Sequence, residues 1–372
     1  MAFTEQALPP WRRAVLKVGS SLLTTPEGAL TGAHAVALAS FVAASRAQGR
    51  EVVIVSSGAV AAGRGLAAPQ QGSGLVGRQA LAALGQTHLV ALWQGFFDDA
   101  PVAQVLLTHD DLRHRRRYLN ARSTLRELLA LGAIPVINEN DTVAVDELKV
   151  GDNDNLAAIV AALVDADLLL IASDVAGLYS ADPRAVIDAV AIDDVAAVTP
   201  ALLASAGGAG SRAGTGGMRT KLEAADKAAS AGIGTVIFDG RNAAVVGRLA
   251  SGSLSGTRFR AQGGRVAART SWLRHAPVAG RIDIDAGAAA ALRSRGASLL
   301  PGGVTSATGD FARGDVVEVG EGDRVIARGI AQYAASDIRR LAGKHTREIE
   351  AVLGYSYGET IIHRDDLVVL PG

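Results

Sequence analysis

The feature that most constrains the fold is an alternation, up to about residue 240, between short apolar runs and longer stretches rich in alanine and leucine. The short runs are rich in β-branched residues and predict buried strands at 14–18, 51–55, 102–107, 134–138, 168–172 and 235–238. The longer stretches predict helices at 33–48, 77–97, 119–131, 155–164 and 218–231. Strands and helices that alternate in this way are typical of an α/β fold, in which a mainly parallel sheet is covered by helices on both faces.

The pattern changes in the last quarter of the chain. From residue 279 onward, GRIDID, DVVEVGEGDRVIARGI and DLVVL predict short strands, and Asp337–Leu353 predicts a helix capped by Ser336 or Asp337. Because 372 residues exceed one typical domain, we expect an α/β domain over 1–260, a linker over 261–278 and a small β-rich domain over 279–372.

An arginine-rich stretch surrounds the predicted linker. Residues 241–278 contain seven arginines and no acidic residue, and we expect this stretch to be a linker with a docking role. Its arginines are expected to pair with carboxylates of the neighbouring domain. The same charge leaves RNA binding open as an alternative, although residues 279–372 hold 11 basic and 13 acidic side chains and lack a basic footprint.

Composition excludes several classes of protein. Lys+Arg and Asp+Glu both number 37, so no global field attracts nucleic acid or an anionic membrane. The absence of cysteine excludes disulfides, thiolate metal sites and cysteine catalysis. The opening MAFTEQALPPWRR has no apolar core of a secretory signal, and no apolar run approaches the roughly 18 residues of a membrane span. We therefore expect a soluble cytoplasmic protein that contacts no membrane.

Polar or glycine-rich segments follow the predicted strands, at the sheet edge where ligands of parallel sheets bind. In Lys17-Val18-Gly19-Ser20-Ser21, the glycine lets backbone N–H groups approach an anion and the lysine adds a charge for phosphate. In Ser56-Ser57-Gly58, hydroxyl and amide donors face a carboxylate or phosphate. The alternatives are an ordinary turn for the first segment and a helix N-cap for the second.

Two further polar clusters follow later strands. Asn138–Thr142 is followed closely by Gly151–Asn155, where Asp152 and Asp154 recur at a spacing of two; the alternative is a solvated turn that caps a helix near Asn155. A Mg²⁺ ion brought by a nucleotide would need few protein carboxylates here. Residues 214–221, GTGGMRTK, combine a glycine-rich loop, a helix start and a lysine, which favours a second phosphate cradle over a flexible linker.

Taken together, these segments resemble the glutamate 5-kinase branch of the amino acid kinase family, whose members carry a PUA domain. The resemblance covers nearly the whole chain and is carried by KVGSSLLT, VSSGAVAAG, VINENDTVA, KVGDNDNLAA, SDVAGLYSADPR, GTGGMRTKLEAA, SLLPGGV, FARGDVV and LGYSYG. It implies an amino acid kinase fold followed by a PUA-like domain. It also implies ATP-dependent phosphorylation of the γ-carboxylate of L-glutamate to L-glutamyl 5-phosphate, the first step of proline biosynthesis.

The resemblance also implies roles for individual residues. Lys17 and Lys221 would contact the transferred phosphoryl group, and Asp152 and Asp154 would organise these lysines. Glutamate would be held by Ser57, Asp141 and Asn153. The residues that would border ATP are Lys17, Gly19, Ser20, Ser173, Asp174, Thr215, Gly216, Gly217, Met218, Arg219, Thr220 and Lys221. Two of these depart from the family pattern: Ser173 replaces a threonine, and Arg219 stands where a small residue is expected.

The partners that the resemblance implies are small molecules and copies of the same chain. ATP would be the co-substrate with Mg²⁺ carried by the nucleotide, and the protein itself would hold no metal. Feedback inhibition by proline, a homo-oligomer and functional coupling to a glutamyl-phosphate reductase are implied as well, and RNA is not. The alternatives are another amino acid kinase, acting on carbamate, aspartate, N-acetylglutamate or UMP, and an RNA-binding protein that uses the PUA-like domain.

Overall fold

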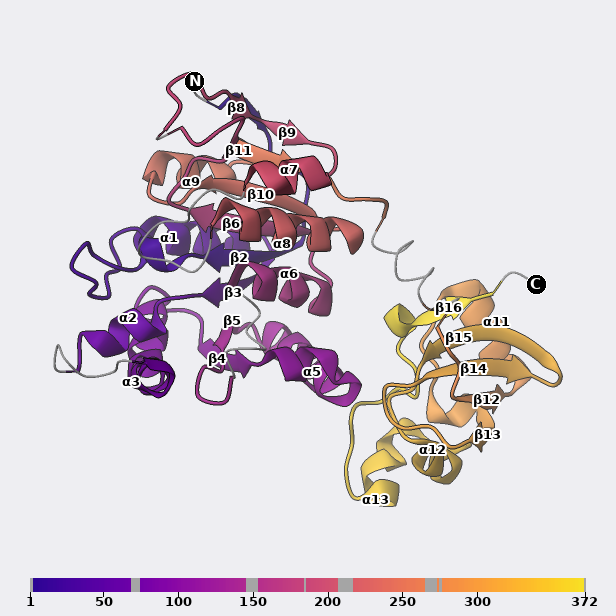
Figure 1. The fold of residues 1–372 in the computed structure, drawn as a ribbon. Helices are drawn as coiled ribbons and strands as arrows, with labels where there is room; N and C mark the ends of the chain where they lie inside the picture. Colours follow the sequence, from indigo (N-terminus) through magenta and orange to yellow (C-terminus); the bar gives the residue numbers. More distant parts are fainter. Residues whose placement is uncertain are drawn as a thin grey trace. The chain divides into compact units, whose positions relative to one another are not determined.

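The computed structural model describes residues 3–67, 74–144, 153–183, 185–206, 217–264, 273 and 276–370. The chain divides into two compact units, Met1–Arg265 and Val266–Gly372 (Figure 1). Much of the predicted linker, 261–278, lies outside the described residues.

A mainly parallel sheet forms the centre of the first unit. In spatial order its strands are β1 (Glu5–Ala7), β11 (Ser253–Phe259), β10 (Gly234–Asp239), β6 (Leu168–Ser173), β2 (Arg13–Val18), β3 (Glu51–Ser56), β5 (Ile134–Glu139) and β4 (Val102–Leu107). Neighbouring strands from β10 to β4 are parallel, whereas β11 is antiparallel to both β10 and β1. The short strand β9 (Asp194–Val195) pairs with β11. The predicted α/β architecture is therefore confirmed.

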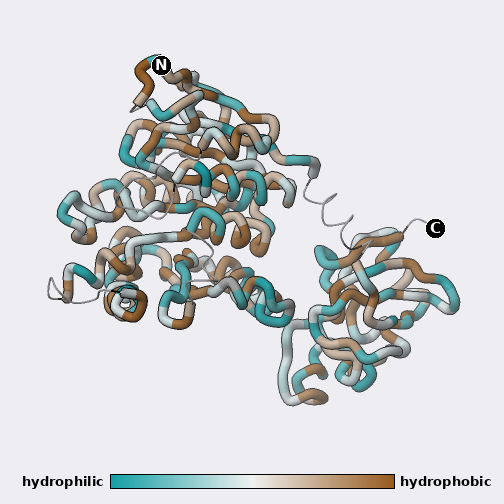
Figure 2. Tube along the Cα trace, in the orientation of Figure 1, coloured by the Kyte–Doolittle hydropathy of each residue, from teal (hydrophilic) through white to brown (hydrophobic). Residues whose placement is uncertain are grey.

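Helices cover both faces of this sheet because neighbouring residues of each strand point to opposite faces and pack into different hydrophobic cores. In β2, Leu16 and Val18 pack with one group of helices, while Val15 packs with the other. The first group is α1 (Ala35–Ala47), α2 (Ala59–Arg64), α3 (Gly74–Gln94) and α9 (Ala243–Ala250). The second is α5 (Arg115–Ala130), α6 (Asn153–Leu163) and α8 (Met218–Ser230). Figure 2 shows hydrophilic and hydrophobic residues alternating along such helices.

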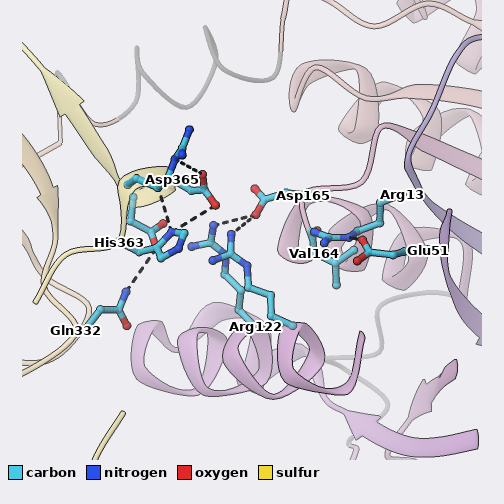
Figure 3. Close-up of polar contacts among 11 residues, drawn as sticks. Arg13, Glu51, Arg122, Val164, Asp165, Gln332, His363 and Asp365 are labelled. Atoms are coloured by element: carbon cyan, nitrogen blue, oxygen red, sulfur yellow. Dashed lines mark hydrogen bonds and ion pairs between the residues drawn. The ribbon is translucent and has the colours of Figure 1, made fainter. Parts of the chain in front are cut away.

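Shorter elements complete the first unit: α4 (His109–Arg113), α7 (Pro200–Ser205) and the pair β7 (Leu178–Tyr179) and β8 (Ala191–Ile192). Ion pairs tie the strands and helices together at the end of the sheet away from the strand carboxyl termini. Arg13 Nε lies 2.6 Å from Glu51 Oε2, which joins β2 to β3, and Arg122 on α5 lies 2.9 Å from Asp165, just after α6 (Figure 3). Arg13 also donates to the carbonyl of Val164.

The expectation for the arginine-rich stretch was partly wrong. Residues 243–250 form α9 and 253–259 form β11, and both belong to the first unit. Arg258 and Arg260 each lie 2.7 Å from Asp194 of the same unit, not from a carboxylate of a neighbouring domain. The stretch has no acidic residue of its own because Asp194, the carboxylate that pairs with Arg258, stands 64 residues earlier in the chain. Composition alone therefore did not indicate a strand here.

The second unit is β-rich, as predicted. Its sheet has the order β13 (Val304–Gly309), β12 (Gly280–Ile284), β14 (Val316–Glu321), β15 (Arg324–Ile330) and β16 (Leu367–Val369), and α11 (Ala286–Arg295) packs against it. The single helix expected over Asp337–Leu353 was wrong. Two short helices, α12 (Ala335–Leu341) and α13 (Ile349–Leu353), are separated by Gly343, whose φ of +72° is left-handed. The N-cap of α12 is Ala334 rather than Ser336 or Asp337.

Within the described ranges, no helix combines the length and the apolar character that crossing a membrane requires.

Candidate active site

A cavity of about 620 Å³ lies at the carboxyl ends of the parallel strands. Its walls come from the ends of β2, β3, β5, β6 and β10 and the segments that follow them, and from residues of α2, α3, α6 and α8. This is the edge where the sequence pattern places ligands, because the polar ends of neighbouring parallel strands meet there.

Two lysines share one buried carboxylate beside the cavity. Asp154, in the first turn of α6, is fully buried; its Oδ1 lies 2.5 Å from Lys17 Nζ and its Oδ2 lies 3.1 Å from Lys221 Nζ. The lysines are 4% and 7% exposed. Burial opposes the charged form of Asp154, but the two ammonium groups outweigh it and hold the pKa of this carboxyl well below its usual range. The cluster therefore carries a net charge of +1 facing the cavity.

The periodicity of β2 explains how Lys17 reaches this cluster. Lys17 stands between Leu16 and Val18, which point into the core covered by α1 and α9, so its own side chain points to the opposite face. That face is covered by α6 and α8, which supply Asp154 and Lys221. The hydroxyl of Thr220 lies 3.0 Å from Asp154 Oδ2, so the first turn of α8 is bound to the first turn of α6.

A network of amide and hydroxyl groups joins the ends of β3 and β5 to α6. Asn153 Nδ2 lies 2.7 Å from Ser57 Oγ and 3.0 Å from Asn138 Oδ1. Asn138 in turn donates to Gln86 Oε1 of α3 at 3.0 Å. The turn from Ser57 into α2 passes through Gly58, whose φ of +114° is one that a residue with a side chain rarely adopts.

The segments after β2 and β6 form another part of the cavity wall. Gly19 is extended and leads into a 3₁₀ turn, Ser20–Leu22; a Cβ on Gly19 would lie 3.7 Å from Lys17 Nζ. After β6, Ser173 Oγ lies 3.4 Å from Asp174 Oδ1, and the guanidinium of Arg241 lies 3.6 Å from Asp174 Oδ2. Gly19, Ser173, Asp174 and Arg241 thus line the same cavity as the lysines.

The structure brings most of the predicted site residues to this cavity. Those that line it are Lys17, Gly19, Ser20, Ser57, Asp141, Asn153, Ser173, Asp174 and Lys221. Asp154 lies behind the lysines, and Gly217, Met218, Arg219 and Thr220 open α8 without being part of the cavity wall. The guanidinium of Arg219 turns to Glu223, 3.0 Å away on the helix surface. Asp152, Thr215 and Gly216 lie outside the described residues.

Sequence reasoning assigned no role to several polar residues of the cavity wall, among them Arg64, Arg78, Asn138 and Arg241. Asn138 stands inside a segment that the sequence had marked as polar, so a signal for it existed. The arginines carry no such signal, because an arginine on a helix or a loop usually faces water. In the part of the chain that the structure describes, no group of three or more His, Cys, Asp or Glu side chains could hold a metal ion.

Known families and known proteins match this chain over most of its length. Residues 12–239 match the model of the amino acid kinase family, and residues 280–353 match that of the PUA domain. The glutamate 5-kinase of Xanthomonas euvesicatoria pv. vesicatoria is 66% identical over 363 residues, 96% of this chain and all of that protein. The glutamate 5-kinase of Xylella fastidiosa (strain M23) is 62% identical over 376 residues, 99% of this chain and 98% of that protein. Among solved structures, a UMP kinase from Bacillus anthracis is 16% identical and covers 68% of this chain and 98% of its own, with a TM-score of 0.48.

Proposed function

Because the chain belongs to the glutamate 5-kinase branch of the amino acid kinase family, we propose that it transfers the γ-phosphoryl group of ATP to the γ-carboxylate of L-glutamate. The product is L-glutamyl 5-phosphate, and the reaction is the first step of proline biosynthesis. The relatives that match from end to end, PUA domain included, favour this reaction over that of a carbamate, aspartate, N-acetylglutamate or UMP kinase and over RNA binding.

The observation that carries the proposal is the pair of nearly buried ammonium groups that line the cavity. Transfer requires a carboxylate anion to approach a polyanionic phosphate chain, and the main obstacle is the repulsion between them. Lys17 and Lys221 place two positive charges where this repulsion is greatest, in a site that excludes much of the solvent.

The phosphoryl transfer needs no general base. A γ-carboxyl group has a pKa of about 4.3 and is already ionised near pH 7. One of its oxygens attacks the γ-phosphorus, the bond to the bridging oxygen breaks, and ADP leaves with the electron pair. Catalysis then consists of aligning the reactants and stabilising charge in a loose phosphoryl transition state.

Each residue of the cluster has a role in that alignment. Lys17 and Lys221 bind the transferred group, and Asp154 is a positioning residue that holds both lysines in place. A carboxylate whose pKa lies so far below its usual range is a poor proton acceptor, which argues against Asp154 as a base. Asp152 is assigned to the same task by the family resemblance alone.

Substrates would lie on either side of the lysines. Ser57, Asp141 and Asn153 are the residues that we assign to glutamate. For ATP they are Gly19 and Ser20 over the phosphates, Ser173 and Asp174, and the loop and helix start from Thr215 to Lys221. Arg219, which faces Glu223, belongs to the rim of this nucleotide site rather than to its interior.

ATP acts as the co-substrate together with Mg²⁺. The ion neutralises phosphate charge when it is bound, and it needs few protein ligands because it retains much of its water. The carboxylate of Asp174, which lines the cavity beside the residues assigned to ATP, fits such a nucleotide-borne ion.

L-glutamyl 5-phosphate is an acyl phosphate and hydrolyses readily, so a glutamyl-phosphate reductase should consume it promptly. The family resemblance also supports a homo-oligomer, feedback inhibition by proline and a cytoplasmic location. It supports the division of the chain into a kinase domain over 1–260, a linker over 261–278 and a PUA-like domain over 279–372.

The test replaces each lysine in turn. Lys17→Ala and Lys221→Ala should each lower kcat by about 10²-fold or more, because a charge aimed at the transition state is lost. Acyl phosphate is trapped with hydroxylamine after incubation with ATP and glutamate, and circular dichroism checks that the fold survives. Lys344→Ala, an exposed lysine of the second unit, is the matched control. A near-normal kcat in either site variant would refute the role assigned to that lysine. Faster turnover of carbamate, aspartate, N-acetylglutamate or UMP than of glutamate would refute glutamate as the substrate.

A further inference from the structure

We propose that Arg64 and Arg78 bind the α-carboxylate of the amino acid substrate and make the enzyme select acceptors that carry a second carboxylate. The inference rests on the proposed function and deepens it. The family resemblance assigned neither arginine, and both line the cavity.

The cavity has two chemically different ends, set by the order of the strands. Asp174 and Arg241, which follow β6 and β10, lie toward one side of the sheet. Asp141, which follows β5, lies toward the other side, because the order runs β10-β6-β2-β3-β5. Neighbouring strands are about 5 Å apart, so the end near β5 is well removed from the end near β10. Lys17, on β2, lies between the two.

Arg64 and Arg78 both belong to the end near β5, and the packing of α2 on α3 brings them together. A Cβ on Gly63 would lie 1.9 Å from the carbonyl oxygen of Leu81, and one on Gly85 would lie 1.9 Å from that of Ala59. The two helix backbones are therefore in direct contact and run antiparallel. Arg64 follows Gly63, and Arg78 stands one turn before Leu81, so both guanidinium groups emerge at the same end of the helix pair.

Hydrogen bonds hold α3 against the end of β5. Gln79 Nε2 donates to the carbonyl of Ala144 at 3.0 Å, and Gln86 Oε1 accepts from Asn138 at 3.0 Å. Arg78, Ala82 and Gln86 are spaced four apart and share one face of the helix. Ala82 and Gln86 are buried, so this face of α3 is turned toward the sheet. Arg78 lies at the end of the same face and lines the cavity.

The chemistry of this end matches the head of an amino acid. With its γ-carboxylate at the lysines, glutamate extends an α-carboxylate and an α-ammonium group toward the far side of the cavity. Guanidinium groups bind carboxylates in a bidentate manner, and Asp141 supplies the opposite charge for the ammonium group. The phosphates of ATP need other partners, because Ser173, Asp174 and Arg241 mark the opposite end.

The test removes one substrate group and one protein group at a time. 4-Aminobutyrate retains the carboxylate that would be phosphorylated but lacks the α-carboxylate, whereas glutarate retains both carboxylates and lacks the ammonium group. The variants are Arg64→Met, Arg78→Met and the double variant, which preserve much of the side-chain volume. The matched control is Arg241→Met, which removes a cavity arginine from the opposite end.

For glutamate we expect kcat/KM to fall about 10- to 100-fold in the double variant, mainly through KM, because charged hydrogen bonds are lost. The inhibition constant of glutarate against glutamate should rise by a similar factor, and that of 4-aminobutyrate should stay within about twofold. Arg78→Lys should restore part of the loss relative to Arg78→Met. Arg241→Met should leave the ratio of the two inhibition constants unchanged.

Two results would overturn this inference and leave the proposed function intact. The first is an equal rise of the glutarate and 4-aminobutyrate inhibition constants in the Arg64 and Arg78 variants. The second is a ratio of these two constants that changes in Arg241→Met but not in the Arg64 and Arg78 variants. Absence of acyl phosphate formation from glutamate by the wild-type enzyme would overturn the proposed function, and this inference with it. Measuring inhibition rather than turnover keeps the comparison informative even where 4-aminobutyrate is not phosphorylated.

Discussion

Replacing Asp154 with asparagine removes the negative charge that Lys17 and Lys221 share and leaves the size of the side chain almost unchanged. Asp154 is fully buried, and the lysines are nearly so, so their two positive charges would lose this counter-charge in a site with little water. Removing one partner of a buried ion pair costs about 3–5 kcal/mol. Two cations depend on this carboxylate, so the upper half of that range is expected for Asp154→Asn.

Thermal unfolding of the full chain measures this cost. For a unit of this size, each kcal/mol lowers Tm by about 2–4 °C, so the first unit of Asp154→Asn should melt on the order of 10 °C lower at pH 7. Removing one ammonium as well, in Lys17→Met/Asp154→Asn, should recover part of the loss, because the repulsion between the lysines is gone. A non-hydrolysable ATP analogue should raise Tm more in Asp154→Asn than in the wild type, since its phosphates replace the missing charge.

The pH dependence has a definite sign. The pKa of Asp154 is lowered in the folded state, so its stabilising contribution is complete above the unfolded value of about 3.9 and is lost as the pH falls through the folded value. The gap in Tm between wild type and Asp154→Asn should therefore be constant near neutral pH and narrow below about pH 4. A Tm within 2 °C of the wild type at pH 7, or strictly additive effects of the Lys17 and Asp154 changes, would show that the shared carboxylate does not hold the lysines.

Further predictions concern the helix pair and the second unit. In Gly85→Ala the new Cβ would meet the carbonyl oxygen of Ala59 at 1.9 Å and force α2 and α3 apart. We expect the free energy of unfolding in urea to fall by about 1–3 kcal/mol and the KM for glutamate to rise. An unchanged KM would contradict a role of the α2–α3 contact in binding glutamate. The hydrogen bond from Tyr355 to Asp337, 2.7 Å long, raises the pKa of that phenol to about 12, so its contribution to stability is full below about pH 10 and is lost as the pH rises through 12. Absorbance titration near 295 nm should show this late transition, and Asp337→Ala should move it back toward 10; a titration that Asp337→Ala leaves unchanged would rule out this cause.

Part of the site could be predicted from the sequence because strand ends are local features. Lys17 and Ser57 each follow or end an apolar β-branched run, and parallel strands bring such ends to one edge. Asn153 and Asp154 belong to a polar cluster that the sequence places directly before a helix, and the helix itself begins at Asn153. Each of these residues is marked by a hydrophobic pattern that extends over only about ten residues. Such a pattern can be read from the sequence because buried strands and amphipathic helices require it.

Other parts were out of reach because they depend on contacts between distant segments. Asn138 bonds to Gln86, 52 residues earlier, and only the packing of α3 on β5 brings them together. The counter-charge of Arg258 is Asp194 on a neighbouring strand, so composition alone suggested a linker. The break at Gly343 was missed because helical periodicity continues on both sides of it.

The order of strands and helices, the two-unit organisation and the motifs at the strand ends follow from the sequence, because each arises from local periodicity and residue chemistry. Which side chains meet was decided by the tertiary structure. The face of β2 on which Lys17 lies and the packing of α6 against α8 decide that Lys17, Asp154 and Lys221 form one cluster. No local pattern contains that information, since it depends on which strands become neighbours and which helices cover each face of the sheet.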